Sequence, residues 1–324
     1  MWRRVIRQLF VFWALCIGTT VSLAAEPLVL ALSRTPLSLP FFIAEKKEFF
    51  AAEGLPIKIV EVIGGHRSLQ QVIDGQADLA TSSETVVMFN SFQRSDYAVI
   101  ATFVTSDDDT KIVASKDSGI TRVDQLAGKR VATVVGGSSH YYLDTTFYLN
   151  GIDPKSVQVK NLQPEAMADA LNKGDVDAIA IWEPFPFMAL QTLPGSRVLP
   201  KSGPYATTFN LIARKDLRGA RDDDLVKLLR ALDRAAVFIK TEPAQAKAIL
   251  RDRLQLDQSF IEWIWPRYNY RLSLDQSLLK TLEAEARWAR REGSVKGDQS
   301  PNYMNFVYTK PLRSVRAAAV GIVE

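Results

Sequence analysis

The sequence predicts an α/β fold with mostly parallel sheets. Short apolar runs typical of strands alternate with segments of helical periodicity from residue 28 to residue 213. Small-residue turns such as Gly64-Gly65 and Gly136-Gly137 separate several of them. Strands and helices that alternate in this way form βαβ units, in which helices cover a parallel sheet. From residue 222 to about residue 289 the apolar residues recur at helical spacing, which predicts a helical C-terminal part.

The expected elements follow from the apolar pattern and from the residues that end it. Residues 28–33 form a largely apolar run, which predicts a buried strand, and residues 56–62 alternate as a second strand. Gly54 is the expected C-cap of a helix over 40–54. The other predicted strands are 77–80, 97–104, 111–114, 131–135, 157–161, 176–181 and 207–213, and the other predicted helical segments are about 68–74, 84–93, 123–126, 140–150 and 164–173.

Two similar α/β halves followed by a helical part fit two arrangements. The halves could be two domains in sequence, or two lobes connected by crossing strands. The element pattern leaves both arrangements open.

The first 24 residues have the features of a cleavable secretion signal. Three arginines within the first eight residues precede an apolar run over 9–21, and small residues follow at 22–24. We expect cleavage after Ala24 or, alternatively, Ala25. An uncleaved anchor is the less favoured alternative, because the apolar run is short for a bilayer span.

Cys16, the only cysteine of the chain, lies inside this segment, and the bulky Leu15 before it argues against a lipoprotein. A mature chain without a thiol can form no disulfide, thiolate metal site or cysteine nucleophile. The chain has only two histidines, His66 and His140. A metal site would therefore have to be mostly carboxylate, and we expect neither a metal nor another cofactor.

The net charge argues against a nucleic-acid partner. The chain has 40 Lys and Arg and 36 Asp and Glu, and removal of the three signal arginines leaves 37 basic residues against 36 acidic ones. A nearly neutral protein lacks the large basic surface that attracts nucleic acids and anionic membranes. We expect contact with a membrane only through a membrane-bound partner.

A turn between a predicted strand and a predicted helix forms a candidate anion site. It contains Gly137, Ser138, Ser139 and His140. The first N–H groups of a helix lack intrahelical partners and its dipole favours negative charge. Hydrogen bonds to an anion contribute about 1.5–3 kcal/mol each. A serine nucleophile with His140 as its base is not expected, because adjacent residues at a helix start point in different directions.

A second hydroxyl-rich turn, Thr81, Ser82 and Ser83, is the expected opposite half of the site. One of these serines could be only an N-cap, although a cap can also contact a ligand. Glu84 follows directly. A glutamate in a first helical turn is favoured by the dipole, and we prefer this explanation to a contact with a ligand amine.

Further candidate ligand-binding residues lie at other strand ends and among the aromatic residues. Ser33, Gly65 and His66 lie at or after the carboxyl ends of the first two strands, where open α/β sheets bind ligands. His66 could instead be a local cap or a surface residue. Phe41 and Trp182 are candidates for contact with an apolar ligand tail, although most such aromatics are core residues and Trp182 is the stronger candidate.

Several short motifs, in this order and spacing, resemble those of periplasmic solute-binding proteins of the nitrate, sulfonate and taurine ABC-transporter family. The likeness covers nearly all of the chain after the signal. The motifs are Ile63-Gly-Gly65 with LQQVIDGQADL at 69–79, Leu126-Ala-Gly-Lys-Arg-Val131, Gly137-Ser-Ser-His140, Asn161-Leu-Gln-Pro164, and Gly174-Asp-Val-Asp-Ala178 with Ile181-Trp-Glu-Pro184.

The resemblance implies a two-lobed, type II periplasmic-binding-protein-like fold, with a mixed sheet flanked by helices in each lobe and the ligand cleft at the hinge. Lobe 1 would contain residues 25–107 and 210–324, and lobe 2 residues 108–209. In the family, the turns that match 138–140 and 81–83 grip the anionic head group. The resemblance also implies a monomer in the periplasm that delivers a small organic anion to ABC permease and ATPase subunits.

The resemblance bears on the choice of ligand as well. Taurine-binding members place an acidic residue on the strand that matches 207–211, where this chain has Phe209. We therefore expect an aliphatic or aryl sulfonate rather than taurine, with nitrate less favoured still. A periplasmic sensor subunit and a thiamin-pyrimidine synthase-like protein are the alternatives. The latter depends on a cysteine-rich motif, and the chain also lacks G-x-S-x-G, H-E-x-x-H and phosphate-loop motifs, so no enzyme is expected.

Overall fold

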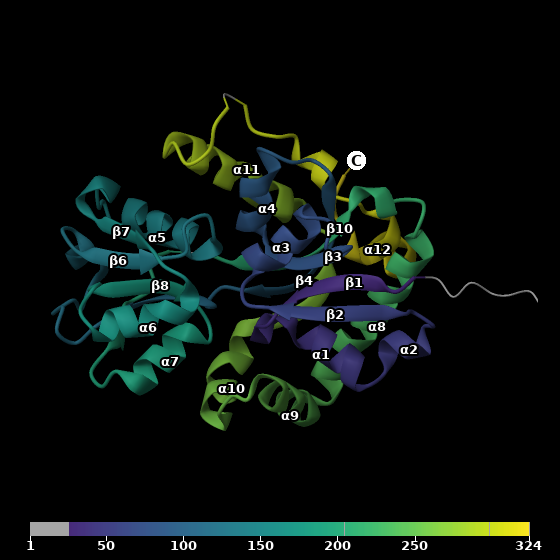
Figure 1. Cartoon of the computed structure of the whole chain (residues 1–324), viewed down its shortest axis with the longest axis horizontal. Helices are drawn as coiled ribbons and strands as arrows, with labels where there is room; N and C mark the ends of the chain where they lie inside the picture. Colours follow the sequence, from purple (N-terminus) through teal and green to yellow (C-terminus); the bar gives the residue numbers. More distant parts are fainter. Residues whose placement is uncertain (1–25, 204, 298, 324) are drawn as a thin grey trace, which may run out of the picture.

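The computed structural model describes residues 26–203, 205–297 and 299–323, so the predicted secretion signal lies outside the described residues. The chain forms two mixed β-sheets, each flanked by helices and placed side by side along the long axis (Figure 1). This is the predicted α/β class with two lobes. We call the body around the six-stranded sheet lobe 1 and the body around the five-stranded sheet lobe 2.

The sheet of lobe 1 has the strand order β11-β4-β10-β3-β1-β2. Strand β1 pairs in parallel with β2 and β3, and β10 pairs antiparallel with both β3 and β4. Parallel strands covered on both faces are nearly continuous apolar runs, as β1 is up to its last residue, Ser33. The strands are β1 (Leu28–Ser33), β2 (Ile57–Val62), β3 (Leu79–Ser83), β4 (Tyr97–Ser106), β10 (Thr207–Arg214) and β11 (Tyr268–Ser273).

The helices of lobe 1 come from both ends of the described chain. The long α8 buries leucines at helical spacing and carries three aspartates in its first turn, where the dipole favours them. The helices are α1 (Leu39–Lys46), α2 (Phe49–Ala52), α3 (Gly65–Ile73), α4 (Glu84–Ser91), α8 (Asp222–Thr241), α9 (Pro243–Leu254), α10 (Gln258–Ile264), α11 (Gln276–Arg291) and α12 (Lys310–Val315).

The sheet of lobe 2 has the strand order β7-β6-β8-β5-β9. Strand β6 pairs in parallel with β7 and β8, whereas β5 is antiparallel to β8 and β9. Apolar clusters lie on both faces of this sheet. The elements are β5 (Thr110–Ala114), β6 (Arg130–Thr133), β7 (Gln158–Asn161), β8 (Ala178–Trp182), β9 (Arg197–Val198), α5 (Ser138–Leu149), α6 (Pro164–Asn172) and α7 (Phe185–Thr192).

Two stretches of chain connect the lobes. Strand β4 ends at Ser106 and β5 begins at Thr110, and the chain returns after β9 to begin β10 at Thr207. Short 3-10 helices complete the described fold: η1 (Pro36–Ser38), η2 (Val123–Leu126), η3 (Pro154–Ser156), η4 (Lys215–Leu217), η5 (Trp265–Arg267), η6 (Tyr303–Phe306) and η7 (Ala317–Ala319).

The fold differs from the sequence-based prediction at several elements. Helices α7 and α12 and the two-residue strand β9 were not predicted. The C-terminal part is not helical throughout, because β11 adds an edge strand to lobe 1 in which the buried Tyr268 and Tyr270 alternate with the exposed Asn269 and Arg271. The predicted helix over 40–54 is two helices, interrupted at Glu48, whose φ is 56°. Strand β3 continues to Ser83, so the hydroxyl-rich segment is the end of a strand rather than a turn.

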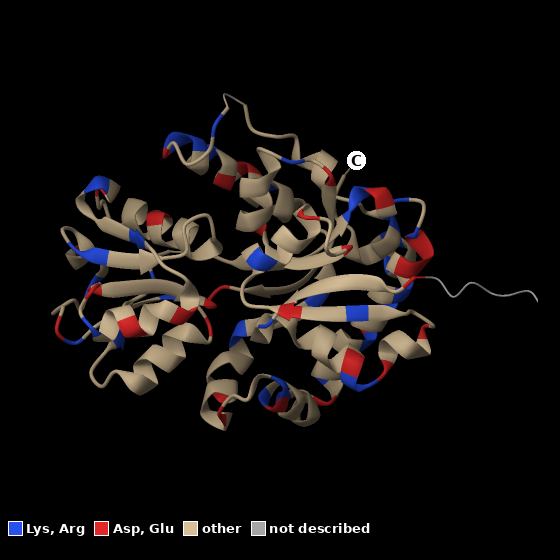
Figure 2. Cartoon of the chain, in the orientation of Figure 1, with Lys and Arg blue, Asp and Glu red and all other residues tan. Residues whose placement is uncertain are grey.

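Charged residues of both signs are interspersed over the helices of the two lobes (Figure 2). Many are paired, such as Arg130 with Asp177 at 2.8 Å and Arg253 with Glu61 at 2.7 Å. Across the described residues, none of the helices combines the length and the apolar character needed to cross a bilayer.

Candidate ligand-binding site

A small pocket lies between the lobes, where strands of both sheets end. Both lobes contribute walls, and the lining is a mixture of hydroxyl groups, glycines and apolar side chains. The lining residues are Ser33, Thr35, Leu37, Gly65, His66, Ser83, Val86, Asp109, Gly137, Ser138, Trp182, Thr207 and Phe209.

The structure brings part of the predicted site together at this pocket. From lobe 1 it places there Ser33, Gly65, His66 and Ser83, and from lobe 2 it places Gly137, Ser138 and Trp182. They come from the ends of β1, β3 and β8 and from the first residues of α3 and α5. Their role in ligand binding stays a prediction, whereas their convergence is a property of the fold.

Other predicted site residues lie beside the pocket without lining it. The Thr81 hydroxyl accepts a hydrogen bond from the backbone N–H of Ser33 at 2.8 Å, and the Ser139 hydroxyl accepts one from Thr133 at 2.9 Å. Ser82 is fully buried. Successive residues of a strand point to opposite faces, so Ser83 can reach the pocket when Ser82 does not.

Phe41 and His140 also differ from the expectation. Phe41 is a core residue of lobe 1, with its ring 4.9 Å from that of Phe103 and edge-on to it. His140 packs edge-on against Trp288 of α11, with ring centroids 5.2 Å apart. Burial lowers the pKa of His140 to about 4, so its imidazole is neutral at physiological pH. It belongs to the contact between the lobes rather than to the pocket wall.

Glycine is needed where the site brings backbones close together. A Cβ on Gly65 would lie 2.9 Å from the Cα of Ser82, closer than real contacts allow. A Cβ on Gly137 would lie 3.2 Å from the Val134 carbonyl oxygen and 3.5 Å from the Trp182 ring. The two glycines therefore let the starts of α3 and α5 approach the pocket.

Two polar groups that line the pocket have no hydrogen-bond partner in the described structure. They are Oγ1 of Thr35 and Nε2 of His66, both buried. An unpartnered buried polar atom is costly, and a ligand that bonded to it would remove that cost. Burial and the neighbouring Arg67 lower the pKa of His66, which favours a neutral imidazole. The prediction missed Thr35, although it lies only two positions after the end of the first strand.

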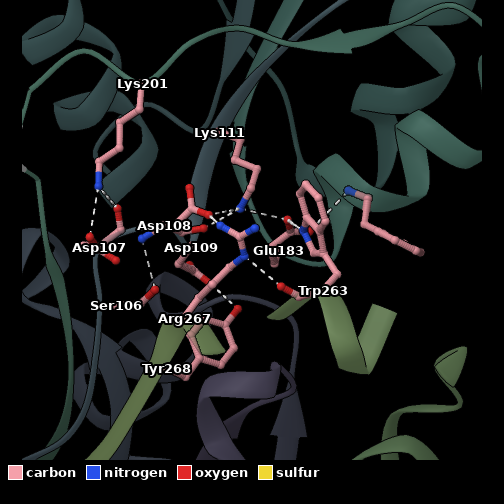
Figure 3. Close-up of polar contacts among 11 residues, drawn as sticks. Ser106, Asp107, Asp108, Asp109, Lys111, Glu183, Lys201, Trp263, Arg267 and Tyr268 are labelled. Carbon is pink, nitrogen blue, oxygen red and sulfur yellow. Dashed lines mark hydrogen bonds and ion pairs between the residues drawn. The ribbon is translucent and has the colours of Figure 1, made fainter. Parts of the chain in front are cut away.

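A cluster of buried charges lies behind the pocket, at the first crossing between the lobes (Figure 3). Lys111 pairs with Glu183 at 3.0 Å, and the same carboxylate accepts a hydrogen bond from the Trp263 indole at 2.9 Å. Asp109 belongs to both the cluster and the pocket wall. Trp263 thus makes a polar contact between the lobes. The sequence contained no local signal for this contact.

Glu84 is held away from the pocket. Its carboxylate accepts hydrogen bonds from the backbone N–H and the hydroxyl of Thr208, at 2.7 and 2.8 Å, and a longer one from Tyr205. Burial raises its pKa, and that of the neighbouring Glu285 is raised by burial and by Glu84 itself. Glu84 is therefore a buried group that connects α4 to the start of β10, and it does not offer a free carboxylate to a ligand amine.

Two further contacts join the lobes around the pocket. Arg67 of α3 pairs with Glu165 of α6 at 2.7 Å, on an exposed rim. On the opposite side, the indole of Trp288 donates a hydrogen bond to Asp144 of α5 at 3.2 Å. Together with the contact of Trp263, they hold the two lobes closed over the pocket. In the described part of the chain, the His, Cys, Asp and Glu side chains form no group of three or more that could bind a metal.

Comparisons with known proteins give the family and support the fold. The family model described as NMT1/THI5 like matches residues 35–246. A protein of Bacillus subtilis (strain 168) that is named for binding aliphatic sulfonates is 26% identical over 234 residues, 69% of each chain.

Solved structures share the architecture at low sequence identity. The alkanesulfonate-binding protein SsuA from Xanthomonas axonopodis pv. citri, bound to MOPS, aligns with a TM-score of 0.77 and 20% identity, over 88% of this chain and 100% of that one. The desulfurization enzyme DSZB aligns with a TM-score of 0.63 and 16% identity, over 90% and 99% of the two chains. A binding protein and an enzyme thus share this fold, and fold alone does not decide between them. The chain belongs to the NMT1/THI5-like family and has a periplasmic-binding-protein fold.

Proposed function

We propose that this chain is the solute-binding component of an ABC importer. In this role it captures a small organic anion between its lobes in the periplasm and delivers it unchanged to permease and ATPase subunits. The observation that supports this most is the pocket between the lobes, which is lined by Thr35 and His66, each with an unpartnered polar atom, and by Ser138 at a helix start. The relatives named for binding sulfonates support the same role.

The start of α5 is the proposed receptor of the anionic head group. The N–H groups of His140 and Tyr141 already donate to the Gly137 carbonyl, at 3.1 and 3.4 Å. The N–H groups of Ser138 and Ser139 are therefore the first-turn donors left for an anion, and the Ser138 hydroxyl lines the pocket beside them. Hydroxyls of Ser83 and Thr35 from lobe 1 would complete the grip.

The remaining walls favour an uncharged tail. Trp182, Phe209, Leu37 and Val86 give the pocket a largely apolar lining. Phe209 occupies the position where an acidic residue would suit an amine, and Glu84 is engaged with β10. We propose an aliphatic or aryl sulfonate as the ligand class, ahead of taurine and nitrate. The proposed lobes are residues 25–107 with 210–324 and residues 108–209, acting as a monomer that closes at the hinge.

Titration calorimetry with a matched panel tests the proposal. The panel contains 1-propanesulfonate, benzenesulfonate, taurine and nitrate. We expect both sulfonates with uncharged tails to bind more tightly than taurine or nitrate. Because taurine differs from 1-propanesulfonate by an ammonium in place of a methyl group, this pair isolates the effect of the tail charge. A response to taurine or nitrate alone would refute the proposed ligand class.

A further inference from the structure

The cluster at the hinge contains more acidic than basic groups. Lys111, Asp109 and Glu183 are buried, whereas Asp108 and Arg267 are half-buried. Lys111 and Arg267 are its cations, and Asp108, Asp109 and Glu183 are its carboxyl groups (Figure 3). Asp108 and Asp109 belong to the crossing between β4 and β5. Lys111 belongs to β5, Glu183 directly follows β8, and Arg267 belongs to η5. Such a cluster is neutral only when one of its carboxyl groups carries a proton.

Both cations are already paired with other carboxylates. Lys111 lies 3.0 Å from Glu183 and 3.6 Å from Asp108, and Arg267 bonds directly to Asp108. Glu183 also accepts hydrogen bonds from Trp263 and from a backbone N–H of α7. Asp109 is the carboxyl group of the described cluster that has no ion pair.

The surroundings of Asp109 favour its neutral form. Its side chain is buried, and its Oδ1 accepts a hydrogen bond from the Tyr268 hydroxyl at 2.6 Å. Burial, opposed by Tyr268 and Lys111, raises the pKa of Asp109 to about 7, and the charges of Glu183 and Glu84 act in the same direction as burial. The other titratable group on the same pocket wall is His66, which is favoured in its neutral form.

We infer that Asp109 is a specificity-determining residue that binds the organic anion as a neutral carboxylic acid, donating the hydrogen bond of its O–H to the ligand. This inference rests on the proposed function. With Oδ1 accepting from Tyr268, Oδ2 carries the proton and is the donor. The described lining residues include no Lys or Arg, so an ionised Asp109 would repel an anion without a compensating cation. A carboxylic acid kept neutral in an apolar site can act as a hydrogen-bond donor in this way.

The inference makes anion binding proton-linked. When Asp109 is ionised in the free protein, binding takes up one proton from solvent, which forms the O–H bond at Oδ2, and no other covalent bond forms or breaks. Affinity is then highest below pH 7 and falls above it, by about tenfold between pH 6 and pH 8. Proton uptake rises from about 0.1 per ligand at pH 6 to about 0.9 at pH 8.

Calorimetry with 1-propanesulfonate at pH 6, 7 and 8, in two buffers of different ionisation enthalpy, measures both quantities. Asp109→Asn keeps a donor of similar shape, so we expect it to bind with an affinity that no longer depends on pH and with no proton uptake. The matched control is Asp107→Asn, because the Asp107 side chain is 72% exposed and pairs with Lys201 on the surface. This control should behave as the unmodified chain does.

A second variant tests the inference independently of Asp109→Asn, which could fail to fold. Tyr268→Phe removes a hydrogen bond that lowers the pKa of Asp109. The fall in affinity should therefore move to higher pH in this variant.

Three results would overturn the inference while leaving the proposed function intact. The first is an affinity for 1-propanesulfonate that does not depend on pH. The second is proton uptake that persists in Asp109→Asn, which would point to His66. The third is an affinity for taurine that increases as the pH rises. The last result would mean that an ionised Asp109 pairs with the ammonium group. Failure of every sulfonate to bind at any pH would instead refute the proposed function itself, and the inference with it.

Discussion

The two adjacent serines at the start of α5 should have different roles, and single substitutions can separate them. Ser138 lines the pocket, whereas the Ser139 hydroxyl accepts a hydrogen bond from the buried Thr133 at 2.9 Å. Ser138→Ala should remove one hydrogen bond to an anionic head group. Such a bond contributes about 1.5–3 kcal/mol, so affinity for a sulfonate should fall about 10- to 150-fold with little change in stability.

Ser139→Ala should show the converse behaviour. It leaves the buried Thr133 hydroxyl without this partner, which costs about 1–3 kcal/mol of unfolding free energy. Each kcal/mol lowers the melting temperature by about 2–4 °C for a chain of this kind. Affinity should change little, because the backbone N–H of residue 139 remains as a donor.

Two measurements on both variants test this separation of roles. Titration calorimetry with 1-propanesulfonate gives the affinity, and thermal unfolding without ligand gives the stability. Each serine is the matched control of the other, because both changes remove one hydroxyl from the same helical turn. An unchanged affinity in Ser138→Ala would refute the placement of the anion at α5. Equal losses of affinity in the two variants would refute the separation of their roles.

Three further predictions follow from the contacts around the pocket. Gly65→Ala places a Cβ 2.9 Å from the Cα of Ser82, so the unfolding free energy should fall by about 1–3 kcal/mol in unfolding experiments. An unchanged unfolding free energy would mean that α3 can shift freely. Trp263→Phe removes the indole hydrogen bond to Glu183 between the lobes and so makes the closed form less stable. Its affinity for a sulfonate, measured by calorimetry, should be about tenfold weaker. The control variant Trp265→Phe should bind the sulfonate as the unmodified chain does. The pKa of Asp109 is near 7 in the folded chain, so between about pH 4 and pH 7 the folded chain binds more protons than the unfolded chain. The contribution of Asp109 to stability therefore declines as the pH rises through that window. The unfolding free energy of Asp109→Asn relative to that of the unmodified chain should therefore rise by about 2–3 kcal/mol between pH 5 and pH 8, as measured in denaturant titrations. A difference in unfolding free energy that stays constant over this pH range would contradict the raised pKa.

Much of the fold could be predicted because its signals are local. The run at 28–33 and the segment at 123–126 have the predicted bounds, and most other elements differ by a few residues. The missed strand β11 had a local signal too, since Tyr268 and Tyr270 alternate with polar residues, but the surrounding helical pattern obscured it. The alternation of strands and helices was enough for the α/β class.

The candidate site could be predicted only in part. Turn composition at the ends of strands indicated Gly65, Gly137 and Ser138, which do line the pocket. It could not show which of several neighbouring hydroxyls faces the pocket. Ser82 and Ser139 point elsewhere because alternate strand positions and successive helix positions face different directions.

The sequence by itself determined the α/β class, most of the strands and helices, and the small-residue turns that allow close approach, because each depends on residues within a few positions of one another. The tertiary structure alone decided that Thr35 and Asp109 join the pocket, that Phe41 and His140 pack elsewhere, and that Trp263 contacts the opposite lobe. These outcomes depend on contacts between distant parts of the chain, such as the hydrogen bond from Tyr268 to Asp109 across 159 positions. No local pattern encodes such a contact, since it forms only when β11 pairs with β4 and places Tyr268 opposite Ser106, close to Asp109.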